Sequence, residues 1–117
     1  MRSFVCLLAI SMAALAHASG IMPGEGKRIE YLIATVETLQ GANFIRNGTA
    51  YDAKAAAAHL RLKLRNAGSR VSNADDFIRI CASVSSVSGK PYLIRYADGR
   101  TVTADAFLRN KLAEYGR

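Results

Sequence analysis

Two dipeptides that favour tight turns, Asn47-Gly48 and Asp98-Gly99, constrain the fold of this chain more than any other feature. A short hairpin loop needs residues that tolerate positive φ, and Asn, Asp and Gly are the types that do. The segments beside these turns predict strands at 43–46, 49–51, 91–96 and 100–103. The sheet is therefore expected to consist of two short antiparallel hairpins.

Helices are predicted before, between and after the hairpins, because apolar residues recur there at helical spacing. They cover approximately residues 27–40, 53–67, 74–82 and 104–115. Asp52 and Thr103 are the expected N-caps of the second and fourth helices, and either Ser72 or Asn73 caps the third. The order predicts an α+β fold, with about four helices packed on a small antiparallel sheet made of two short hairpins.

The first residues have the pattern of an export signal. Arg2 gives a positive start, residues 3–15 are uncharged and largely apolar, and Ala16-His17-Ala18 fits the small-residue cleavage site. The apolar run is too short to span a membrane, which takes about 20 apolar residues. We therefore expect a periplasmic protein with a signal peptide over 1–18 that is cut after Ala18, a flexible leader over 19–26 and a single domain over 27–117.

Removal of residues 1–18 leaves a composition that argues against several classes of function. The net charge falls only from +7 to +6, because Arg2 is the one charged residue removed. Only one cysteine, Cys81, and one histidine, His59, remain, so neither an internal disulfide nor a metal site is expected. Cys81 lies on the predicted buried face of its helix, as a core thiol would. Export argues against nucleic acid as a partner, and neither a cofactor nor a membrane anchor is expected in the mature chain.

Two segments carry side chains suited to binding or catalysis. The run 83–90 combines serine hydroxyls with Gly89 and Lys90, and it predicts either a backbone nest for an anion or a solvated turn. His59 lies near Arg61 in a basic helical stretch. That stretch is either a solvated helix face or a strip that binds an anion or a partner, with a histidine that senses protons.

Three sequence segments resemble the YfeK-like family of small proteins from Gram-negative bacteria. They are NFIRNGTAY at 43–51, HLRLKL at 59–64 and SVSSVSGKPY at 83–92. The resemblance implies a domain of unknown function, usually behind a signal peptide, and supplies no catalytic or binding residues. The polar residues of these motifs that a core does not require form the predicted ligand or partner surface: Arg46, Asn47, His59, Arg61, Ser86, Ser88 and Lys90.

If the two hairpins pair into one sheet, the turn at 46–47 is expected to approach the turn at 88–90. The leading hypothesis for function is a non-catalytic module that binds an anionic envelope component or an acidic partner protein. The first alternative is a small hydrolase that uses His59 as a base with Ser86 or Ser88 as the nucleophile. The second alternative is a structural or assembly protein of the envelope, acting through an apolar surface.

Overall fold

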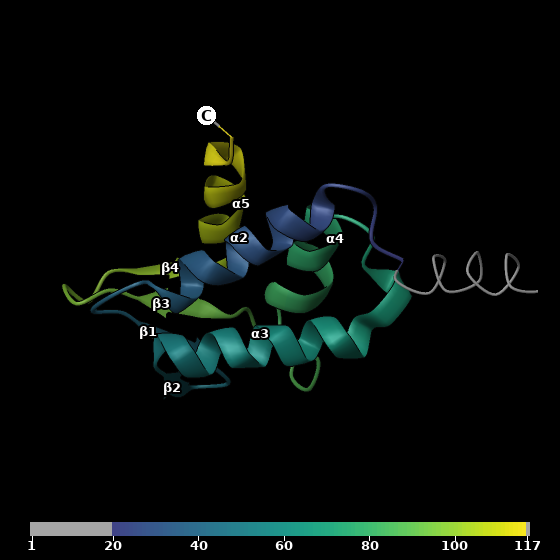
Figure 1. Ribbon diagram of the computed structural model, residues 1–117. Coiled ribbons are helices and arrows are strands. Elements are labelled where there is room, and N and C mark those ends of the chain that lie inside the picture. The colour runs from purple at the N-terminus through teal and green to yellow at the C-terminus, as the bar shows by residue number, and fades with distance from the viewer. Residues whose placement is uncertain (1–19, 117) are drawn as a thin grey trace, which may run out of the picture.

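Helices and two hairpins alternate along residues 20–116, which are the part of the chain that the computed structural model describes (Figure 1). The predicted signal peptide, 1–18, lies outside these residues. The elements are α2 (Glu25–Glu37), β1 (Asn43–Arg46), β2 (Thr49–Tyr51), α3 (Ala53–Ala67), the 3₁₀ turn η1 (Gly68–Arg70), α4 (Ala74–Phe77), the π-helical turn η2 (Ile78–Ala82), β3 (Leu93–Arg95), β4 (Thr101–Thr103) and α5 (Ala104–Glu114). The predicted α+β class is confirmed.

The two hairpins join into a single antiparallel sheet in the order β2-β1-β3-β4. Phe44 on β1 lies opposite Tyr51 on β2 and Ile94 on β3, and Ile94 in turn lies opposite Val102 on β4. Since side chains alternate along a strand, these residues share the face that packs against the helical core. Figure 1 shows the sheet at one end of α2 and α3, which lie side by side.

The N-caps predicted for the second, third and fourth helices are present. Asp52 accepts a hydrogen bond from the Ala55 N–H, and Thr103 accepts one from the Ala106 N–H. Of the two residues considered for the third helix, Asn73 is the cap, because its side chain accepts from the Asp76 N–H. These caps are readable from sequence because donor and acceptor are three residues apart.

The first helix begins earlier than expected. α2 starts at Glu25, two residues before the predicted start at Lys27, and so takes in part of the predicted leader. The Glu25 carboxylate accepts the Ala74 backbone N–H at 2.8 Å, and the Met22 N–H donates to the Ser72 carbonyl. These bonds hold the start of α2 against the start of α4. Their partners lie about 50 residues away in sequence, so local patterns could not indicate them.

The third predicted helix is not a uniform α-helix. A single α-helical turn, α4, is followed by the wider turn η2, and together they lie in the centre of the core. The apolar spacing did not reveal the change, because the same side chains point inward in both geometries. Cys81 is fully buried here, and burial raises the pKa of its thiol, as expected for a core residue. Within residues 20–116, no helix is both long and apolar enough to cross a membrane.

Candidate functional site

A pocket of about 160 Å³ lies between α3 and the first hairpin. Much of its lining is apolar and buried, with Val36 from α2, Phe44 from β1, Leu60 from α3 and Leu108 from α5. Four polar side chains also line it: Arg46, Tyr51, His59 and Tyr92. No carboxylate from the described part of the chain contributes to the lining. The pocket therefore combines an apolar interior with hydrogen-bond donors and one permanent positive charge.

The register of the first hairpin places Arg46 in this pocket. Arg46 is two residues after Phe44, so both side chains lie on the same face of β1. Tyr51 lies opposite Phe44, and Arg46 Nη2 donates to Tyr51 Oη at 3.0 Å. The guanidinium also lies 5.3 Å from the centre of the Tyr51 ring, in a cation–π arrangement. These contacts hold the guanidinium in place, and among residues 20–116 its other N–H groups donate to no protein acceptor.

His59 reaches the pocket from α3. Its Nε2 lies 3.3 Å from Tyr92 Oη, in a hydrogen bond between α3 and the residue that precedes β3. Lys63 follows one helical turn later, and its ammonium lies 5.9 Å from the centre of the Tyr92 ring. Lys63 Nζ also donates to Ser86 Oγ at 3.3 Å. Tyr92 and Lys63 together thus connect the histidine to residues 83–90, which we call the serine loop.

The His59 imidazole is held in its neutral form near neutral pH. Burial lowers its pKa below the ordinary value of 6.5, and the positive charges of Arg46 and Lys63 lower it further. The free energy of unfolding should therefore rise with pH through the interval just below 6.5, because there the unfolded chain binds more protons than the folded protein. Acidification through the same interval should therefore lower the free energy of unfolding.

This dependence is measured by urea unfolding on either side of pH 6.5 for the wild type and for His59→Gln. We expect the wild type to lose more stability on acidification than the variant, whose side chain does not titrate. Equal losses in the two proteins would show that the His59 pKa is not lowered by folding.

The first hairpin turn and the serine loop meet, as the sequence predicted for two hairpins in one sheet. Asn47 Nδ2 donates to Ser85 Oγ at 3.1 Å, and the Ser88 hydroxyl donates to Asn47 Oδ1. Ser85 is 2% exposed, and its Oγ also accepts the backbone N–H groups of Val87 and Ser88. Sequence reasoning missed Ser85, although it lies in the quoted serine motif, because nothing in the motif distinguishes its buried serine from its exposed ones.

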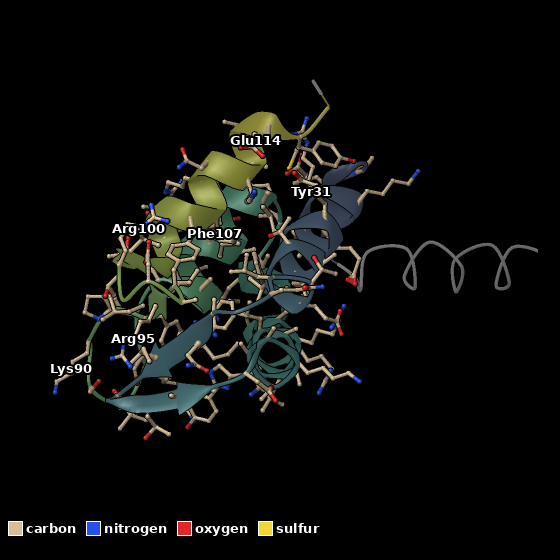
Figure 2. The ribbon with its side chains drawn as sticks, turned by 90° about the vertical axis from the view of Figure 1, so that its left-hand side faces the viewer. Tyr31, Lys90, Arg95, Arg100, Phe107 and Glu114 are labelled. Carbon is tan, nitrogen blue, oxygen red and sulfur yellow. The ribbon has the colours of Figure 1, made fainter. Side chains whose placement is uncertain are left out.

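The serine loop does not offer the backbone nest considered for an anion. Its N–H groups at 87 and 88 donate to Ser85 Oγ, that of Gly89 donates to the Ser85 carbonyl, and that of Lys90 donates to Ser88 Oγ. These donors are therefore already used within the loop. Figure 2 shows the Lys90 side chain extending outward from the loop, away from the body of the protein.

The structure separates Arg61 from the other predicted site residues. Its Nη2 lies 2.9 Å from Glu30 and 3.3 Å from Glu37, both on α2. Arg61 thus joins α2 to α3, and its charge is balanced by two carboxylates. Arg46 and His59 do line one pocket, whereas Ser86 accepts a hydrogen bond from Lys63, and neither of these two residues lines it. Tyr51 and Tyr92 were missed by sequence reasoning, although the register of the Asn47-Gly48 hairpin gives a signal for Tyr51.

The acidic side chains of residues 20–116 are occupied elsewhere. Each forms an ion pair with a lysine or arginine, except Asp52, which caps α3. Within the same residues, neither Arg46 nor Lys63 has a carboxylate within 4.0 Å. No group of three or more His, Cys, Asp or Glu side chains there could hold a metal ion. The positive charge at the pocket is therefore not neutralised by the fold.

Comparison with known proteins agrees with the resemblance seen in the motifs. The chain is 35% identical over 92 residues to a protein of Salmonella typhimurium (strain LT2) named Uncharacterized protein YfeK, a match that covers 79% of this chain and 77% of that protein. No solved structure matches. A family of unknown function, DUF5329, matches residues 23–116, which include every helix and strand described above. The chain therefore belongs to the DUF5329 family.

Proposed function

We propose that this protein is a non-catalytic binding module of the periplasm, and that its pocket takes an anionic ligand of the envelope. One observation carries the proposal: Arg46 lines a largely apolar pocket to which no described carboxylate contributes. A guanidinium in such surroundings gains from an incoming anion, because hydrogen bonds between charged groups are stronger than those between neutral groups. The hydroxyls of Tyr51 and Tyr92 are further donors at the same place.

The polar contacts favour binding over hydrolysis. A serine nucleophile needs a base within hydrogen-bond reach, directly or through one water. Among the described residues, His59 bonds to Tyr92, Ser86 accepts from Lys63, and Ser88 bonds to Asn47. No hydrogen bond joins the histidine to either serine in this part of the chain, so the hydrolase alternative lacks its central contact.

The apolar surface also gives little support to an assembly role. Among residues 20–116, the exposed large apolar side chains come from the segment before α2, from α3 and from the serine loop, and they are Met22, Leu62, Val84 and Val87. Single exposed apolar residues are normal on soluble proteins and do not indicate an interface. The pocket therefore remains the surface best suited to recognition.

The proposal is tested on the protein recovered from the periplasmic fraction of a Gram-negative host, where its sequence is expected to begin at Ser19. Thermal unfolding at low salt is then compared with and without acetate, sulfate or phosphate. We expect at least one anion to raise the melting temperature, and added sodium chloride to reduce the rise by screening.

Two matched arginine variants locate the site. Arg46→Gln should weaken binding of that anion by about tenfold or more, the cost of a hydrogen bond to a charged group. Arg95→Gln is the control, because Arg95 is an exposed residue of β3 that does not line the pocket. An equal loss in both variants, or no stabilisation by any anion, would overturn the proposal, as would a protein retained in the cytoplasm.

A further inference from the structure

We propose that the ligand is a monocarboxylate with an apolar group of about six carbons, bound with its carboxylate at Arg46 and its apolar group among the buried side chains. This inference rests on the proposed function, and it adds the size, charge and orientation of the ligand. Three properties of the pocket carry it: its volume, the distribution of burial along its lining and the arrangement of its donors.

The volume sets the size of the apolar group. The pocket measures about 160 Å³, and an engineered apolar protein cavity of about 150 Å³ is known to bind benzene. A group of about six carbons therefore fills this space. A long acyl chain would extend into solvent, and a folded polypeptide could insert no more than one side chain. The volume thus favours a small organic acid over a lipid or a protein partner.

The positions of buried and half-buried residues along the lining set the orientation of the ligand. Leu60, Ala82 and Leu108 are buried within the lining, whereas Arg46 and His59 are only half-buried. The apolar side chains therefore form the interior, and the charged end faces the mouth. Figure 2 looks along α3 and shows β1 and β2 beside it, and these elements contribute His59 and Arg46 to the lining of the pocket. A carboxylate at the mouth keeps part of its hydration while the apolar group leaves water.

The hydrogen-bond donors of the pocket favour a ligand that carries a single negative charge. Arg46 is the one arginine that residues 20–116 contribute to the lining, and the planar pair of N–H groups of a guanidinium matches the two oxygens of a carboxylate. The His59 imidazole is neutral near neutral pH because burial, Arg46 and Lys63 lower its pKa, so it brings no second positive charge to the pocket. A doubly charged phosphate would leave one of its charges unbalanced in a largely apolar site, which is costly.

The test is a titration of the purified protein with n-alkanoates from butanoate to decanoate, followed by calorimetry. Affinity should increase about fourfold per added methylene, the gain expected for burial of one CH₂, and should level off beyond about six or seven carbons. Hexanamide, which has the same chain without the charge, should bind about tenfold more weakly than hexanoate or worse. Inorganic phosphate should bind more weakly than hexanoate.

Two alanine positions on α3 provide matched variants. Ala56 lines the pocket, and Ala58 is exposed on the same helix and does not line it. Ala56→Leu should fill the pocket and remove the increase with chain length, while Ala58→Leu should bind like the wild type. Thermal unfolding of each variant establishes that it is folded.

The outcomes separate this inference from the proposed function. Binding of phosphate or acetate that needs Arg46 but does not increase with chain length would overturn the inference and leave the anion site standing. Hexanamide binding as well as hexanoate would overturn both, since it would show an apolar pocket without anion recognition. An equal effect of the two leucine variants would also overturn the inference, because the chain would then lie outside this pocket.

Discussion

Phe77→Ala is expected to lower the free energy of unfolding by about 3–5 kcal/mol, the usual cost of removing a buried aromatic ring. Phe77 is 0% exposed and lies where α4 passes into η2, within the main core. The total stability of a domain this size is of the order of 5–15 kcal/mol, so the variant will be close to unfolding. At about 4–8 °C per kcal/mol, the melting temperature should fall by roughly 12–40 °C.

Urea unfolding followed by circular dichroism measures this loss. The matched control is Val87→Ala, because Val87 is 86% exposed and its truncation should change stability by less than about 0.5 kcal/mol. A loss below about 1.5 kcal/mol for Phe77→Ala would mean that the core closes around the missing ring, and the central position assigned to α4 and η2 would then be wrong.

The second large effect concerns the contact between the first turn and the serine loop. Asn47→Ala should cost about 2–4 kcal/mol. Asn47 has a φ of 52°, a left-handed conformation that asparagine adopts more readily than alanine, because its short polar side chain can hydrogen-bond locally. The substitution also removes the bonds to Ser85 and Ser88, each worth about 1 kcal/mol.

Asn47→Gly separates these two causes. Glycine adopts positive φ without strain, so this variant loses only the hydrogen bonds and should cost about 1–2 kcal/mol less than alanine. In both variants the N–H groups of Val87 and Ser88 should exchange with solvent faster, because the Ser85 hydroxyl that they bond loses its anchor. Unchanged exchange would show that the loop holds its shape without Asn47.

The features that the sequence predicted correctly depend on neighbours in the chain. The Asn47-Gly48 turn and the cap at Asp52 each involve donors and acceptors within a few residues, and both are present. The meeting of the turn with the serine loop also followed, once the two hairpins were assumed to pair. The α+β class could be derived in the same way, from the order of elements alone.

The features that escaped prediction depend on contacts between distant segments. The sequence does not distinguish the charge of Arg46 from that of Arg61, yet Glu30 and Glu37 neutralise Arg61. Arg46 lines the pocket and has no carboxylate of residues 20–116 within 4.0 Å. Only the packing of α2 against α3 distinguishes them. The pocket forms only where β1 pairs with β3 and α3 packs against β1. Tyr51 and Tyr92 line the pocket only in that arrangement.

The edges of the sheet have a consequence for solubility. Both outer strands, β2 and β4, are three residues long, and each passes almost at once into a helix, α3 or α5. An exposed strand edge is a template on which another chain can add, and short edges are one way in which proteins avoid this. Two molecules that collide edge to edge can form few backbone hydrogen bonds before a helix blocks the ladder. The short strands therefore protect this protein against aggregation by sheet extension.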